Sequence, residues 1–116
     1  AYAFNYDLDV DVVCLPSAMV TELAGVAAAL GADTLGIKAD PDQAHQAIAD
    51  ALKAAQQGCV LLGTAAMMHP DFALLRGLAA NIANAAGTTY GCVGLGGNDL
   101  GAWMAGALRI VSRAVV

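Results

Sequence analysis

The chain of 116 residues has the length of one domain, and 59% of its residues are hydrophobic while only 13% are charged. Its net charge of −5 and its five scattered basic residues argue against nucleic-acid binding, because phosphate contacts supply most of that affinity. The sequence holds no uninterrupted run of about 20 apolar residues, so no membrane-spanning helix is predicted. A signal peptide is not expected either, since no basic segment precedes an apolar one at the start.

This composition predicts a piece of a larger protein. A free-standing domain of this size ordinarily has a more charged surface, and this chain also ends in the apolar run 110–116. We therefore expect residues 1–116 to form a single α/β domain whose surfaces are covered by other domains or subunits. A tight oligomer is the alternative.

The first third of the chain predicts a strand followed by a helix. Residues 1–9 are expected to form a loop with aromatic anchors. Three aspartates between positions 7 and 11 alternate with apolar residues, which favours one solvated face over a cation site. The valine-rich run 10–15 predicts a strand. Ser17 is then a plausible N-cap for a helix over 18–30, which Gly31 ends, and Glu22 is expected on its solvated side.

A second helix is predicted after the linker 31–40. Asp40 is expected as its N-cap, Pro41 as its first residue and Gln43 as the partner in a capping box. The helix should end near Gln57, with Gly58 following it, and its polar side should carry His45. Its buried face is expected to contain Ala44, Ala47, Ile48, Ala51, Leu52 and Ala55.

The second half of the chain predicts two further strands and two helices. The continuous apolar run 59–62 is typical of a buried strand, and a loop over 63–68 follows it. Pro70 is expected to begin a helix that Gly87 closes, with a stripe of Phe72, Leu75, Leu78, Ala79, Ile82 and Ala83. A strand over 90–95 then leads through Gly96, Gly97 and Asn98 into a helix with Leu100, Trp103, Met104 and Ala107 on one side. Trp103 is predicted to be its buried anchor.

Strands separated by helices imply parallel pairing through crossover connections, with helices on both faces of the sheet. The expected fold is therefore a layered, Rossmann-like α/β domain. Ligands in such folds lie beyond the carboxyl ends of the strands, which here lead to 16–17, 63–68 and 96–98. The glycine turn at 96–98 could accordingly contact a ligand, but the interpretation as a tightly packed turn is favoured. No Rossmann fingerprint and no Walker A motif is present.

The residues with useful chemistry do not form a recognisable catalytic set. His69 could act as a base, but its position before Pro70 suits helix entry as well. Thr64 could contact a phosphate or satisfy backbone groups. The three cysteines lack metal-site spacing and are interpreted as buried thiols, and the adjacent Met67 and Met68 as interface packing. We assign no catalytic, cofactor-binding or metal-ligating residue.

Two stretches of the sequence resemble one protein family. The first contains Val60-Leu61-Leu62-Gly63, Ala66, His69-Pro70, Phe72-Ala73, Leu75-Arg76 and Leu78-Ala79. The second, more specific one contains Gly96, Asn98, Gly101-Ala102-Trp103 and Ala105-Gly106-Ala107-Leu108. With the segment from Tyr6-Asp7 to Pro16-Ser17, they resemble the large iron–sulfur subunit of bacterial NADH-quinone oxidoreductase, respiratory complex I. The resemblance covers roughly residues 1–108, and after it this chain has Arg109-Ile110-Val111 where the family has Pro-His-Arg.

The resemblance implies the molybdopterin-oxidoreductase-like C-terminal region of that large subunit. It implies a scaffold role in an enzyme that passes electrons from NADH through iron–sulfur clusters to quinone. The parent subunit would carry 2Fe–2S and 4Fe–4S clusters, while this fragment would hold no cofactor. Its expected partners are the rest of its own chain and other complex I subunits, in the peripheral arm on the cytoplasmic side of the bacterial inner membrane. A cofactor-holding domain of a molybdopterin enzyme, such as a formate dehydrogenase-like oxidoreductase, and a small homo-oligomeric binding module are the alternatives.

Overall fold

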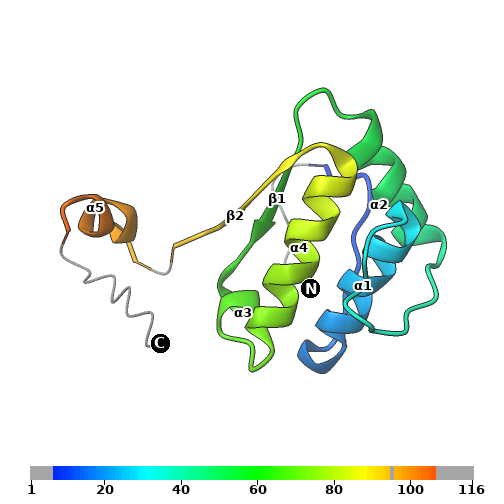
Figure 1. The fold of residues 1–116 in the computed structure, drawn as a ribbon, viewed down its shortest axis with the longest axis horizontal. Helices are drawn as coiled ribbons and strands as arrows, with labels where there is room; N and C mark the ends of the chain where they lie inside the picture. Colours follow the sequence, from blue (N-terminus) through cyan, green and yellow to red (C-terminus); the bar gives the residue numbers. More distant parts are fainter. Residues whose placement is uncertain (1–6, 95, 107–116) are drawn as a thin grey trace, which may run out of the picture.

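A computed structural model describes residues 7–94 and 96–106, and within them helices pack against a small parallel sheet (Figure 1). The elements in chain order are a 3-10 turn η1 (Pro16–Ala18), α1 (Met19–Leu30), α2 (Gln43–Ala54), β1 (Cys59–Leu62), α3 (Thr64–Met67), α4 (Phe72–Ala86), β2 (Thr89–Cys92) and α5 (Asp99–Met104). The mixed α/β class is therefore confirmed.

The two strands of the described part are parallel, as the sequence pattern predicts. β1 and β2 pair in register from Cys59 opposite Thr89 to Leu62 opposite Cys92, and α4 connects them. The second strand is shorter than the predicted 90–95, and Leu95 lies outside the described residues. Two strands are too few to define a layered, Rossmann-like fold.

Helices cover one face of this sheet. Val60 and Leu62 point toward α4, where Leu62 packs with Leu75 and Ala79 in a buried cluster. α1 lies against α4, and α2 lies against α1 (Figure 1). Leu61 points to the opposite face and is 62% exposed. The expected helices on that second face are not found among residues 7–94 and 96–106.

The core between α1 and α4 depends on small residues. Ala24 and Ala27 of α1 are fully buried and pack with Leu78 and Ile82 of α4. Alanine side chains let the two helix backbones approach closely, and the larger side chains of α4 fill the remaining space. The predicted stripe of α4 is confirmed, with Phe72 half-buried at its start.

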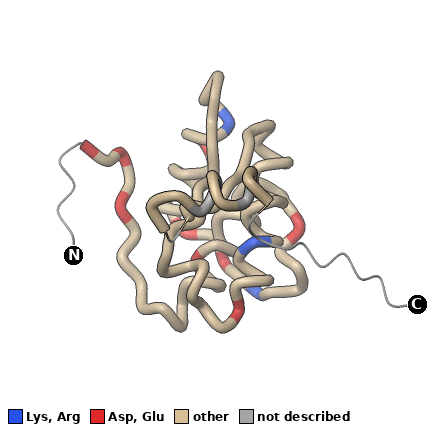
Figure 2. Tube along the Cα trace, turned by 90° about the vertical axis from the view of Figure 1, so that its left-hand side faces the viewer, with Lys and Arg blue, Asp and Glu red and all other residues tan. Residues whose placement is uncertain are grey.

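The predicted strand over 10–15 is wrong. This stretch has extended backbone without a strand assignment, and Val13 and Leu15 are each 73% exposed. Figure 2 shows it running along the outside of the body, with the acidic residues near its start. An extended segment becomes a strand only when a neighbour accepts and donates its backbone hydrogen bonds, and no described segment does so here.

The helix ends are predicted better than the helix starts. Gly31 and Gly87 end α1 and α4 with φ values of 72° and 68°, the left-handed backbone that glycine adopts without strain. Ser17 lies inside η1 rather than capping α1, and Asp71, not the residue before Pro70, precedes α4. The expected loop 63–68 contains the short helix α3.

α2 differs most from its predicted form. It begins after Asp42 instead of Asp40, and it ends at Ala54 because Ala55 has extended backbone, so Gly58 does not terminate it. Its buried residues are His45 and Ala49, whereas Ala47, Ala51 and Ala55 of the predicted face are exposed. The predicted face is correct at Ile48 and Leu52, which pack against the core, and wrong at the three exposed alanines. The pattern of apolar residues missed His45 because it counts a histidine among the polar residues.

The last helix lies apart from the body. The chain after β2 carries α5 away from the other helices (Figure 1), and Met104 on α5 is 75% exposed. The predicted anchor Trp103 has a side chain that lies outside the described residues, and so does Ala107.

Candidate functional site

Two of the three predicted loops are brought together by His69. The Val93 amide donates to the Leu62 carbonyl at 2.9 Å, which extends the sheet by one bond. After β1 the chain reaches His69, whose Nε2 lies 3.0 Å from the Pro16 carbonyl oxygen. His69 and Pro16 therefore lie together, but 16–17 does not follow a strand, because 10–15 is not one, so the predicted meeting of strand ends is not what joins them. The glycine turn 96–98 is carried away on the segment that leads to α5 (Figure 1).

His69 fastens the start of α4 to the start of α1. The Asp71 amide donates to Nδ1 at 3.0 Å, so Nε2 bears the ring proton and donates to Pro16. The side chain is only 9% exposed. Because a general base needs an unoccupied nitrogen within reach of its substrate, this arrangement favours the helix-entry interpretation of His69 over the catalytic one.

His45 is expected from the sequence on the polar side of its helix, and it is instead 6% exposed and bonded through both ring nitrogens. The Asp42 amide donates to Nδ1 at 3.1 Å, and Nε2 lies 3.1 Å from Glu22 Oε2 on α1. The Asp42 carboxylate in turn accepts from the His45 amide at 2.9 Å, which completes a capping box. Glu22 is therefore not simply a solvated residue, because its carboxylate joins α1 to the start of α2.

The capping box also changes the acidity of Asp42. Donation from the His45 backbone amide is the largest cause that lowers the pKa of Asp42 below its ordinary value. The nearby imidazole and the Ala44 amide act in the same direction, while partial loss of hydration opposes them. The carboxylate is consequently favoured in its charged, hydrogen-bonded form.

The cap makes a testable prediction for α2. Asp42→Ala should lower the thermal midpoint by a few degrees near neutral pH, because the His45 amide at the start of α2 loses the carboxylate that accepts its hydrogen bond. Since the folded-state pKa lies below the ordinary value, the contribution of Asp42 is present above that ordinary value and is lost as pH falls through the folded pKa. The difference in midpoint should therefore shrink in acid, as thermal melts followed by circular dichroism would measure. Asp40→Ala is the control, and an equal loss there would contradict the assignment of the cap.

A small apolar hollow adjoins this cluster. It has a volume of about 170 Å³ and is lined by residues of 7–15, α1 and α2, namely Val12, Cys14, Met19, Glu22, Leu23, Val26, His45 and Ile48. Cys14 and His45 share it, but both nitrogens of His45 are already bonded. The hollow therefore lacks the free base that would activate a thiol nucleophile.

The cysteines are predicted to be buried, and all three are exposed. Cys14 lies on the extended segment, and the two others lie on the sheet, which has few neighbours to cover it. Cys92 is paired with Leu62, so it lies on the face opposite to Cys59. Within the described ranges no group of three or more His, Cys, Asp or Glu side chains could hold a metal ion.

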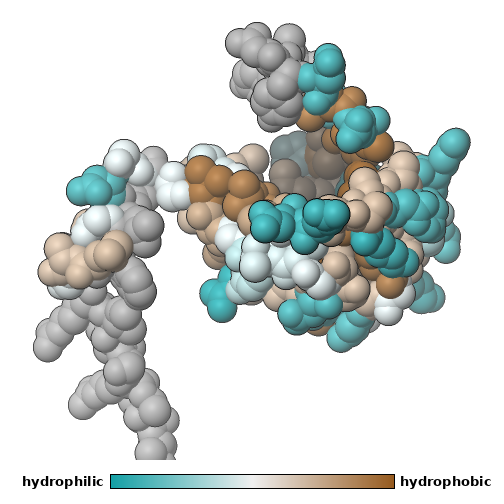
Figure 3. All heavy atoms as spheres, turned by 90° about the horizontal axis from the view of Figure 1, so that it is seen from above, coloured by the Kyte–Doolittle hydropathy of each residue, from teal (hydrophilic) through white to brown (hydrophobic). Residues whose placement is uncertain are grey.

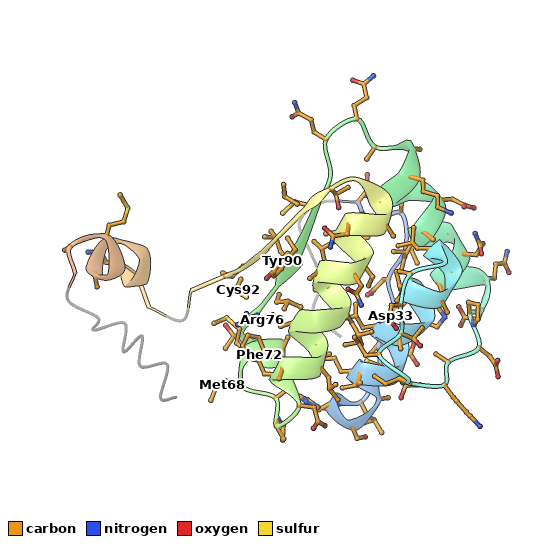
Figure 4. All side chains as sticks on the ribbon, in the orientation of Figure 1. Asp33, Met68, Phe72, Arg76, Tyr90 and Cys92 are labelled. Atoms are coloured by element: carbon orange, nitrogen blue, oxygen red, sulfur yellow. The ribbon has the colours of Figure 1, made fainter. Side chains whose placement is uncertain are left out.

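A larger groove runs between α4 and β2. Its volume is about 500 Å³, and it is lined by Phe72, Ala73, Arg76, Gly77, Ala80 and Tyr90. Figure 4 shows Phe72, Arg76 and Tyr90 along the same side of α4. The groove is not predicted from the sequence, where only the buried stripe of this helix is considered, although the spacing of Ala73, Gly77 and Ala80 places them on one face of α4.

The two histidines and the larger groove are features suited to packing and docking. Both described histidines serve helix starts, and the larger groove combines aromatic rings with one basic side chain. None of the described helices has the length and apolar character needed to cross a membrane. Comparison of the chain with protein-family models, curated proteins and solved structures finds no match.

Proposed function

We propose that this chain is a scaffold domain of the large iron–sulfur subunit of a bacterial NADH:quinone oxidoreductase, respiratory complex I. The observation that carries the proposal is that residues 60–79, which resemble the family, form consecutive elements at the centre of the fold. The stretch that resembles the family occupies the end of β1, α3 and the first half of α4. In this proposal the two strands are the centre of a larger, Rossmann-like layered sheet that other parts of the subunit complete.

The exposed apolar surface supports the scaffold role. Leu61, Tyr90 and Val93 are 62%, 41% and 49% exposed around the strands. Seen from above, apolar surface gathers where the body passes into the segment that leads to α5 (Figure 3). Exposed apolar surface on both faces of the strands is typical of a segment that packs against partners. We assign its burial to the rest of the subunit and to neighbouring subunits, in the peripheral arm on the cytoplasmic side of the membrane.

The iron–sulfur clusters that the parent subunit would carry do not fit the described residues. Cys59 and Cys92 lie on opposite faces of the sheet, and Cys14 lies on the segment before α1. Cluster ligation needs several thiolates that converge on one point. The proposal therefore assigns cluster binding and electron transfer to other parts of the parent, and to this domain only the support of their arrangement.

Purification of the whole gene product from solubilised membranes of its source organism tests this function. NADH:quinone reductase activity and iron–sulfur electron paramagnetic resonance signals should copurify with the tagged protein in constant ratio. A product that purifies without iron and without NADH-oxidising activity would overturn the proposal. Stoichiometric molybdenum and pterin in the purified protein would instead favour a molybdopterin enzyme, the second candidate function.

A further inference from the structure

The outer edge of β2 is open for pairing with another strand. The amides of Thr89 and Val93 donate to carbonyl oxygens of the segment that contains β1, at 3.3 and 2.9 Å. Alternate residues of β2 thus direct their backbone groups toward β1, and the amides and carbonyls of Tyr90 and Cys92 point to the opposite edge. Among the described residues only β1 pairs with β2.

The composition of this edge does not protect it from pairing. Charged residues and proline commonly block an open edge, because its free donors and acceptors attract other extended chains. β2 reads Thr-Tyr-Gly-Cys, without a charge or a proline, and Tyr90 is 41% exposed. A further strand suits such an edge, since an extended chain supplies the matching row of acceptors and donors.

The groove between α4 and β2 lies beside this edge and can receive side chains of an added strand. Tyr90 lines it from β2. Phe72, Arg76 and Ala80 recur every four residues and line it from α4 (Figure 4). The small side chains of Ala73 and Ala80 leave room for apolar groups. In strand addition the backbone bonds give affinity, and pockets of this kind for alternate side chains give specificity.

Arg76 selects the charge of the added segment. Its side chain is exposed, and within the described part of the chain no carboxylate forms an ion pair with it. An acidic side chain on the groove side of the strand would pair with this guanidinium. The chain's own segments do not match, because 107–116 contains two arginines and no acidic residue, and the acidic segment 7–15 lies against α1 and α2.

From these features we propose that a strand from a part of the subunit outside residues 1–116 pairs with the open edge of β2 and places an acidic side chain against Arg76. The same subunit is the source because neighbouring parallel strands are normally joined by crossover connections of one chain. The inference rests on the proposed function, since that function makes this chain a domain of a larger subunit. It adds the edge at which the sheet continues and the charge of the segment that continues it.

Photo-crosslinking in the whole, tagged gene product tests this pairing. The photoreactive amino acid p-benzoylphenylalanine replaces Tyr90, and mass spectrometry identifies the crosslinked peptides. We expect a crosslink within one polypeptide, shown by its mass on a denaturing gel, to a segment outside residues 1–116 with an acidic residue beside the crosslinked position. Arg76→Glu should lower the yield of this crosslink by roughly fivefold or more, because like charges oppose docking.

Lys53→Glu is the matched control, because it makes the same charge reversal at an exposed position of α2 outside the groove. It should leave the yield unchanged, and circular dichroism should show that both variants are folded. A crosslink to residues within 1–116, to a second copy or to another protein would overturn the proposal, as would no crosslink at all or equal yields in the two variants. Iron content and NADH oxidation do not enter this measurement, so failure of the strand pairing is distinguished from failure of the proposed function.

Discussion

Leu78→Ala is expected to lower the free energy of unfolding by about 2–5 kcal/mol. Leu78 is fully buried between α1 and α4, where it packs with Ala24, Ala27 and Ile82. Removal of three side-chain carbons leaves a cavity that the flanking alanines cannot fill, because they have no side-chain freedom with which to rearrange. Urea denaturation followed by circular dichroism would measure the loss. It is large compared with the total stability of roughly 5–15 kcal/mol that small domains have.

Leu74→Ala is the control for this prediction. Leu74 lies one helical turn earlier on the same helix, but it is 38% exposed and belongs to neither buried cluster. The same change of side chain at this position should cost clearly less, because the site is already open to water. Equal losses at the two positions would contradict the packing of α4 against α1.

Local sequence patterns are sufficient to predict the elements that bury one regular face. The stripe of α4 recurs at helical spacing, and glycine is well suited to the left-handed residue after α1 and α4. The parallel pairing of β1 and β2 follows from the helix between them. These features depend on residues that are close in sequence or on the general handedness of chain connections. They can therefore be predicted from a single sequence.

Features that depend on distant partners could not be predicted in this way. The run 10–15 has strand composition, but no described neighbour pairs with it. The position of His45 depends on Glu22, which lies 23 residues earlier, and the capping signal at Asp40 is as plausible locally as the one at Asp42. A histidine three residues after an aspartate is the signal that could have identified the true cap, because its ring can accept from the backbone of the N-cap residue.

Gly25→Ala is expected to destabilise the protein by about 1–3 kcal/mol, although this substitution in a helix is ordinarily stabilising by about 0.5–1 kcal/mol. A Cβ atom at Gly25 would lie 2.7 Å from Cε1 of His45 and 2.9 Å from each ring nitrogen. The ring is buried and is held by bonds to Glu22 and to the Asp42 amide. It can move away only by giving up at least one of these bonds, so the steric cost exceeds the gain in helix propensity.

Gly77→Ala separates this effect from a general intolerance of larger residues. Its Cβ would lie 2.8 Å from Cδ1 of Leu35, a flexible side chain that is 41% exposed and can rotate into solvent. That variant should be neutral or slightly more stable, since the entropic cost of a helical glycine is removed. Chemical denaturation of both variants measures the contrast. If Gly25→Ala also proves neutral, the contact between α1 and the His45 ring is wrong. If it is destabilising, combining it with His45→Ala should recover part of the loss, because the new alanine then has space.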